Sequence, residues 1–197
     1  MKTLGVIVAG GRSSRMGREK VAETLRGRTI LSRIVSVLAP QVDEIVINAS
    51  GDASRFSATG FSVIADMRPE VGTPLAGLHT ALSLGKAKGC VAVLTVPSDA
   101  PFLPADLFAR LGSADGEAAI AASGGQAHYL TGLWSARLLG KIETALSRPR
   151  CPRLQDWARE CEAAIVEWPS RPYDPFFNVN TPEELAEAER IAAEFAL

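Results

Sequence analysis

The 197-residue sequence predicts an α/β fold in which a mainly parallel sheet lies between two layers of helices. Short apolar runs alternate along the chain with segments of helical periodicity, which is typical of repeated strand–helix units. Several of these runs, such as Leu4–Val8 and Cys90–Val96, are apolar almost throughout, as expected for strands covered on both faces. We therefore expect a three-layer α/β/α sandwich with a Rossmann-like sheet and helices on both faces, formed as a single domain over residues 1–197.

Seven apolar runs are expected to be strands: Leu4–Val8, Glu44–Asn48, Ser62–Ala65, Cys90–Val96, Ala118–Ser123, His128–Leu133 and Ala163–Trp168. Helices are expected between them at Ile30–Leu38, Leu75–Leu84, Ala105–Leu111, Ala136–Leu146 and Arg153–Cys161. In the first two of these helices the apolar residues recur with the helical period of about 3.6. A final helix begins after Thr181, the expected N-cap, with Pro182 in its first turn and Glu184 completing a capping box.

The composition excludes several classes of function. Hydrophobic residues make up 47% of the chain, so it has the means to form a core and is not disordered. Its 22 acidic and 21 basic side chains leave a net charge of −1, which argues against coating a nucleic acid or an anionic membrane. No apolar run reaches the length of a membrane span. Three cysteines without a C-x-x-C pair argue against a disulfide framework or a zinc site and predict a cytoplasmic protein.

The turn after the first strand runs from Val8 and Ala9 through Gly10 and Gly11 to Lys20, and it is rich in glycine and positive charge. Glycines let backbone N–H groups approach anionic oxygens, and the cations Arg12, Arg15, Arg18 and Lys20 suit a polyphosphate. Neither a Walker A loop nor a G-x-G-x-x-G fingerprint is present. A surface turn with solvated arginines is the alternative. The position directly after a buried strand favours phosphate binding, because open α/β sheets bind ligands at the carboxyl ends of their strands.

Polar residues also follow the other strands. Asn48 ends the second strand and has both a donor and an acceptor for a base or a ribose, while Asp66 follows the third; either residue alone would also suit a simple turn. Asp99 follows the buried fourth strand, where a rigid carboxylate suits Mg²⁺, which binds one or two carboxylates together with phosphate oxygens. Asn178 and Asn180 precede the last helix and lie on one side of an extended segment.

The two histidines, His79 and His128, lie far apart in the sequence. His79 has no cysteine or carboxylate at metal-ligand spacing, and the sequence shows no serine placed as in a catalytic triad with either histidine. Hydrolase chemistry is therefore not expected.

The loop resembles that of GT-A-like nucleotidyltransferases, which reads roughly L-A-G-G-x-S-x-R-M-G-x-x-K; it is matched at Val8-Ala9-Gly10-Gly11, at Ser13 or Ser14, at Arg15-Met16-Gly17 and at Lys20. Within that class, Ala-Gly-Gly is similar to the molybdenum cofactor guanylyltransferase family. Further similar motifs are Pro74-Leu75-Ala76-Gly77, Asp99-Ala100-Pro101-Phe102-Leu103-Pro104 and Asn178-Val179-Asn180-Thr181-Pro182-Glu183-Glu184-Leu185, so the resemblance covers almost the whole chain. The sequence departs from the family pattern in five places. The loop before Lys20 is one residue shorter and has Glu19 for an aspartate, Thr73 is inserted before Pro74, and Ser98 replaces a cysteine. Tyr129 replaces the proline that often follows the histidine matched by His128, which the resemblance makes a candidate for the pterin side of the cleft.

The resemblance implies a nucleotide-diphospho-sugar transferase-like fold and transfer of GMP from GTP to the terminal phosphate of molybdopterin or the molybdenum cofactor, with Mg²⁺ as the metal. It implies binding roles for Val8, Ala9, Gly10, Gly11, Lys20, Asn48, Asp66, Asp99, Asn178 and Asn180. It also implies catalytic roles for Arg15, Lys20 and Asp99, with Asp99 as the metal ligand.

The residues alone do not determine which nucleotide base the chain binds. A cytidylyltransferase of the same fold and a non-catalytic nucleotide-binding relative are the alternatives. Molybdoenzyme chaperones and other cofactor-biosynthesis proteins are further candidate partners.

Overall fold

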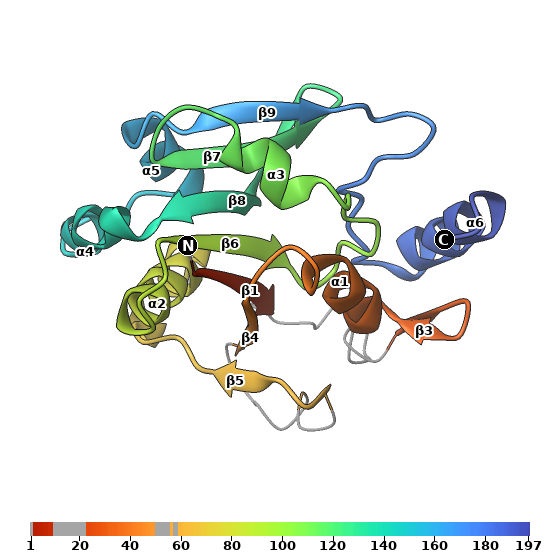
Figure 1. Ribbon diagram of the computed structural model, residues 1–197, viewed down its shortest axis with the longest axis horizontal. Helices are drawn as coiled ribbons and strands as arrows, with labels where there is room; N and C mark the ends of the chain where they lie inside the picture. The colour runs from red at the N-terminus through yellow and green to blue at the C-terminus, as the bar shows by residue number, and fades with distance from the viewer. Residues whose placement is uncertain (1, 10–22, 50–55, 57–58) are drawn as a thin grey trace.

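The computed structural model describes residues 2–9, 23–49, 56 and 59–197. Within them, seven strands form one sheet in the order β5-β4-β1-β6-β8-β7-β9 (Figure 1). The strands are β1 (Thr3–Ala9), β4 (Glu44–Ala49), β5 (Ser62–Ile64), β6 (Ala92–Pro97), β7 (Ala118–Ser123), β8 (Gln126–Ser135) and β9 (Ala164–Trp168). Each of the seven overlaps one of the predicted apolar runs.

Most strand pairs of this sheet are parallel. Strand β1 pairs in parallel with β4 and β6, β5 pairs in parallel with β4, and β9 pairs in parallel with β7. Strand β8 is antiparallel to both of its neighbours, β6 and β7. The reversal arises at Gly124 and Gly125, whose φ values of 56° and 79° are those of a tight hairpin turn. The sheet is therefore mainly parallel, as predicted, with β8 as its reversed strand.

Helices cover both faces of the sheet. On one face, α1 (Ile30–Leu38), α3 (Leu107–Gly112) and α6 (Pro182–Glu194) contribute to one hydrophobic cluster. On the other face, α2 (Pro74–Ala87), α4 (Leu139–Leu146) and α5 (Leu154–Glu160) contribute to a second cluster. Helix α6 begins with the predicted capping box, in which Thr181 Oγ1 accepts from Glu184 N–H. The prediction of a three-layer α/β/α sandwich is confirmed.

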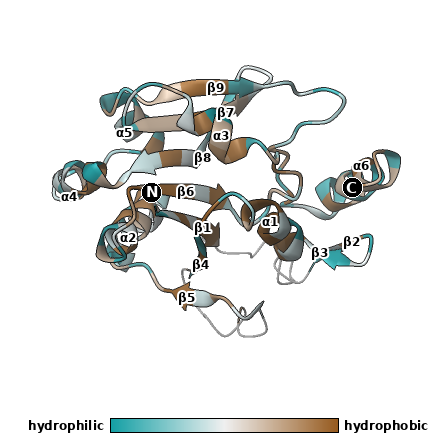
Figure 2. Cartoon of the chain, viewed as in Figure 1, coloured by the Kyte–Doolittle hydropathy of each residue, from teal (hydrophilic) through white to brown (hydrophobic). Residues whose placement is uncertain are grey.

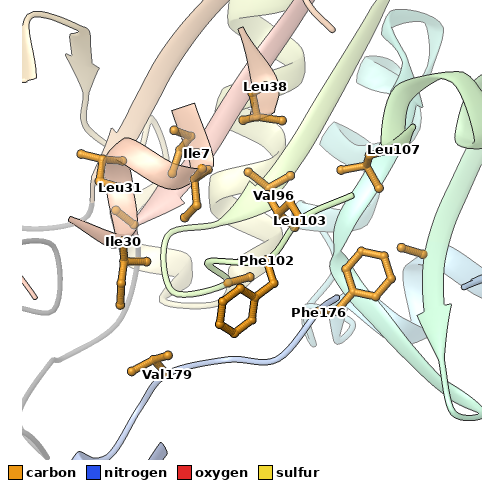
Figure 3. Packing of buried hydrophobic residues seen from close by; sticks show 14 of the residues in the cluster. Ile7, Ile30, Leu31, Leu38, Val96, Phe102, Leu103, Leu107, Phe176 and Val179 are labelled. Atoms are coloured by element: carbon orange, nitrogen blue, oxygen red, sulfur yellow. The ribbon is translucent and has the colours of Figure 1, made fainter. Parts of the chain in front are cut away.

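The core continues up to the carboxyl end of the sheet. In Figure 2, hydrophobic residues gather on the central strands β1 and β6, and every residue of β1 is buried. Phe102, from the loop after β6, and Val179, from the segment that leads into α6, belong to the same cluster as Ile7 of β1 (Figure 3). The loop after β6 and the segment before α6 are therefore fixed against the sheet by packing.

Three smaller elements were not predicted. Strands β2 (Thr24–Leu25) and β3 (Arg28–Thr29) form a two-stranded hairpin, and a 3₁₀ turn covers Pro69–Val71 before α2. A hydrogen bond connects the hairpin to α1, because buried Arg33 of this helix donates from Nη2 to the Leu25 carbonyl oxygen at 2.6 Å. In the part of the chain that the structure describes, no helix is long and apolar enough to cross a membrane.

Candidate functional site

The carboxyl ends of the parallel strands meet at one edge of the sheet. Val8 of β1 lies opposite Asn48 of β4 and Pro97 of β6, and Asn48 lies opposite Ile64 of β5. Asp66 and Asp99 follow shortly after β5 and β6. The register therefore places Val8, Ala9, Asn48, Asp66 and Asp99 along the same edge. Gly10, Gly11, Arg15 and Lys20, which were predicted to belong with them, lie outside the described residues.

Asn48 and Asp66 form a pair beneath the start of α2. Asn48 is 1% exposed, and its Nδ2 donates to Asp66 Oδ1 at 3.0 Å and to the Ile64 carbonyl oxygen at 3.4 Å. Helix α2 approaches this pair at Gly77, where an added Cβ would lie 2.9 Å from Asn48 Oδ1. A glycine is required at position 77 because any Cβ atom there would be too close to the Asn48 side chain. Asn48 therefore fixes the orientation of the Asp66 carboxylate.

Asp99 connects the edge of the sheet to the segment before α6. The neighbouring Ser98 N–H donates to the Val8 carbonyl oxygen at 3.2 Å, which holds the loop against β1. The Asp99 carbonyl oxygen accepts from the Val179 N–H at 2.9 Å. Val179 is buried, and Asn178 and Asn180 lie on either side of it. The structure thus brings Asp99 close to both asparagines, although about 80 residues of chain separate them.

A pocket of about 550 Å³ lies at this position. Val8, Asp99, Asn178 and Asn180 of the predicted set line it, whereas Ala9, Asn48 and Asp66 are not among its lining residues. The lining also includes Thr73 and Pro74 at the start of α2, the first half of β8 from Gln126 to Thr131, residues 151–155 before and within α5, and Phe176. The pocket therefore spans from the carboxyl end of β1 and β6 to the reversed strand β8.

Apart from His128, the candidate for the pterin side of the cleft, the far wall of the pocket was not predicted. Arg153 and Gln155 line it next to Cys151, and Tyr129 faces it from β8. The sequence shows only a helix start around Arg153 and an apolar strand around Tyr129, so no polar motif marks them. Thr73, where the sequence departs from the family pattern, lines the near side; its Oγ1 is buried and has no hydrogen-bond partner among the described residues.

Ser123, His128 and Asp174 form a hydrogen-bonded group beside the pocket. Ser123 Oγ lies 2.7 Å from His128 Nε2 and 2.7 Å from Asp174 Oδ1. The structure thus places a serine beside a histidine, a contact that the sequence did not predict. The hairpin between β7 and β8 folds His128 back beside Ser123, and Asp174 comes from 51 residues further along. The hydroxyl proton is directed to the Asp174 carboxylate and not to His128, so Ser123 is not arranged as a nucleophile activated by histidine.

Comparison with known proteins agrees with this architecture. A family model described as the MobA-like NTP transferase domain matches residues 5–178. The molybdenum cofactor guanylyltransferase of Nitrobacter hamburgensis is 43% identical over 198 residues, covering 97% of this chain and 95% of that protein.

Two solved structures show the same fold. The crystal structure of molybdopterin-guanine dinucleotide biosynthesis protein A from Archaeoglobus fulgidus superposes with a TM-score of 0.73 at 21% identity, over 98% of this chain and 99% of that one. A protein of Mycobacterium tuberculosis, solved in complex with manganese, superposes with a TM-score of 0.67 at 14% identity, over 96% of this chain and 99% of that one. Because the family model spans most of the residues and the Nitrobacter relative is similar over nearly its full length, this chain belongs to the MobA-like NTP transferase domain family.

Proposed function

We propose that the chain transfers GMP from GTP to the terminal phosphate of molybdopterin or the molybdenum cofactor, producing the guanine dinucleotide form and pyrophosphate. The observation that carries the proposal is a continuous pocket that joins the carboxyl end of β1 and β6 to β8, with Asp99 and the two asparagines in its lining. The pocket therefore extends from the strand ends, where the nucleotide is expected, to β8 on the other side. The name and the 43% identity of the Nitrobacter relative support guanylyl transfer in particular.

The nucleotide is assigned to the strand ends. The turn that follows β1, with Gly10, Gly11 and Lys20, would take the triphosphate, and Val8 and Ala9 would bring its first residues to the ligand. The Asn48–Asp66 pair lies at the same edge and would hold the nucleoside, with Asp66 oriented by Asn48. The second substrate would then occupy the part of the pocket lined by β8 and by residues 151–155.

The residues on the pocket wall fit Mg²⁺. The described residues contain no group of three or more His, Cys, Asp or Glu side chains that would hold a metal on their own. Mg²⁺ does not require one, because it commonly binds one or two carboxylates and completes its coordination with phosphate oxygens and water. The Asp99 carboxylate would hold it, next to the amides of Asn178 and Asn180. Bound there, Mg²⁺ would supply positive charge to the phosphates of both substrates. The manganese in the Mycobacterium tuberculosis relative agrees with a divalent metal in this fold.

The reaction needs positioning and positive charge more than acid–base chemistry. An oxygen of the acceptor phosphate forms a bond to the α-phosphorus of GTP, and the bond from that phosphorus to the bridging oxygen breaks as pyrophosphate leaves. A phosphate monoester has a second pKa of about 6, so it is largely dianionic at pH 7 and requires no general base. Arg15 and Lys20 would stabilise the negative charge that develops on pyrophosphate, as cations do in other phosphoryl-transfer sites.

The site lies in a chain suited to the cytoplasm. All three cysteines of the chain, Cys90, Cys151 and Cys161, are free thiols in the structure. Burial raises the pKa of the Cys90 and Cys161 thiols, which keeps them protonated and unreactive. Free buried thiols of this kind are typical of a reducing compartment.

Nucleotide selectivity tests the proposal directly. We expect GTP with Mg²⁺ to raise the melting temperature more than CTP, ATP or UTP at equal concentration, because at equal concentration the ligand that binds the folded state more tightly stabilises it more. Pyrophosphate should be released only when GTP and molybdopterin are both present. An equal or larger shift with CTP would instead assign the chain to the cytidylyl branch, and binding of GTP without release of pyrophosphate would indicate a non-catalytic relative.

A further inference from the structure

The segment between β9 and α6, residues 169–181, carries Asn178 and Asn180 past the pocket without regular secondary structure. One end of it is fixed by the Val179 N–H bond to the Asp99 carbonyl oxygen and by the capping box at Thr181. Its middle is fixed at Asp174 and Phe176. Phe176 is buried, and its ring lies 4.9 Å from the His128 ring and 5.4 Å from the Trp168 ring. Asn178 therefore lies between two anchored points.

Asp174 makes two hydrogen bonds through one oxygen. Its Oδ1 accepts from Ser123 Oγ at 2.7 Å and from the Phe176 N–H at 2.9 Å. Ser123 lies at the end of β7 and is 3% exposed, so its hydroxyl is held within the fold. These bonds connect the turn before Asn178 to the sheet.

The hydrogen bonds also determine where the proton of His128 lies. An ionised carboxylate only accepts, so the single hydroxyl proton of Ser123 goes to Asp174. Ser123 Oγ must then accept from His128, 2.7 Å away, which requires the proton to be on Nε2. The other ring nitrogen, Nδ1, is left as a hydrogen-bond acceptor in the neutral ring.

We propose that Asp174, Ser123 and His128 form a positioning chain for the acceptor side of the pocket. Asp174 holds the segment that carries Asn178, and Ser123 fixes His128 in the Nε2–H form. Because His128 lines the pocket, the nitrogen it can offer to a ligand is an acceptor, suited to an N–H group of a heterocycle and not to a phosphate oxygen. The inference rests on the proposed function only in identifying that heterocycle with the pterin of the acceptor.

The charges around His128 agree with a neutral ring. Burial lowers the pKa of His128 below the usual value, and this effect outweighs the negative charges of Asp174 and Glu167 nearby, which raise it. Glu167 accepts from the Gly125 N–H at 3.0 Å, so its carboxylate is directed to the hairpin turn. At pH 7 the ring is therefore an uncharged acceptor.

The tautomer can be observed without any activity measurement. The chain has two histidines, so ¹⁵N NMR of the labelled protein follows both rings. We expect His128 in the wild-type protein to carry its proton on Nε2, and we expect the variant Ser123→Ala to show a mixture of both tautomers. Ser123→Thr retains the hydroxyl and should restore the Nε2–H form. A predominant Nδ1–H form in the wild type, or an unchanged tautomer in Ser123→Ala, would overturn the inference.

Ser83→Ala is the matched control. Ser83 Oγ lies 3.4 Å from Nε2 of the other histidine, His79, on α2. Its removal should alter the signals of His79 and leave those of His128 unchanged. A change at His128 in this variant would mean that the ring responds to general loosening of the fold, which would also contradict a specific role of Ser123.

Kinetics provide the second measurement. Ser123→Ala should raise the KM for molybdopterin by roughly fivefold to tenfold, the effect of one lost hydrogen bond, with kcat and the affinity for GTP nearly unchanged. An unchanged KM for molybdopterin would contradict the positioning role. The proposed function and the positioning chain can fail separately. A protein that does not transfer GMP can still show the Nε2–H tautomer of His128. An active protein in which His128 shows both tautomers would refute the positioning chain alone.

Discussion

Replacing Asp99 with asparagine is expected to lower the rate of guanylyl transfer by about 10²–10³-fold without unfolding the protein. The side chain keeps its shape but loses the negative charge that would hold Mg²⁺ in the site. The backbone contact survives, because the Val179 N–H donates to the carbonyl oxygen of Asp99 and not to its carboxylate. The measurement is the rate of pyrophosphate release as a function of Mg²⁺ concentration, together with the melting temperature.

Asp106→Asn is the matched control for this variant. Asp106 also follows β6, but it lies outside the pocket lining and accepts from Trp168 Nε1 at 2.9 Å, a bond that an asparagine oxygen can still accept. Its rate and Mg²⁺ dependence should stay near those of the wild type. If Asp99→Asn also kept a rate within a few-fold of the wild type, with the same Mg²⁺ optimum, the proposed metal role of Asp99 would be wrong.

The fold could be predicted in most of its elements, because each depends on local patterns. Helix α1 follows from the apolar residues between Ile30 and Leu38, and its bounds agree with the predicted range. The β2–β3 hairpin could not be found in this way, since strands of two residues show no periodicity. The reversal of β8 depends on the backbone at Gly124 and Gly125, which the apolar pattern of the strand does not reveal.

The near side of the site was predictable and the far side was not. Val8, Asn48 and Asp99 follow from one rule, that parallel strands end at the same edge and ligands bind there. The grouping of Ser123 with Asp174 depends on chain segments 51 residues apart, and no local pattern predicts such a contact. The same holds for Arg153 and Gln155, which reach the pocket only because α5 packs beside β8.

Gly77→Ala is expected to reduce both the stability of the protein and its affinity for GTP. An added Cβ would lie 2.9 Å from Asn48 Oδ1 and 3.2 Å from Val8 Cγ1, closer than packed atoms normally approach. Overpacking of this kind costs roughly 1–3 kcal/mol in the free energy of unfolding, partly offset because alanine favours a helix over glycine. Asn48 would have to move, and Asp66, which depends on its hydrogen bond, would move with it. We expect the affinity for GTP to fall by about tenfold or more.

Gly85→Ala is the control that distinguishes a loss of stability from a loss of GTP affinity. Gly85 lies in the same helix, and an added Cβ there would lie 2.5 Å from Val93 Cγ2 in the core, away from Asn48. Both variants should therefore show a lower free energy of unfolding in denaturant titrations, whereas GTP binding measured by calorimetry should weaken only in Gly77→Ala. Equal weakening in both would show that GTP affinity follows general stability. If the Gly77→Ala protein were destabilised but bound GTP with wild-type affinity, the Asn48–Asp66 pair would not be part of the nucleotide site.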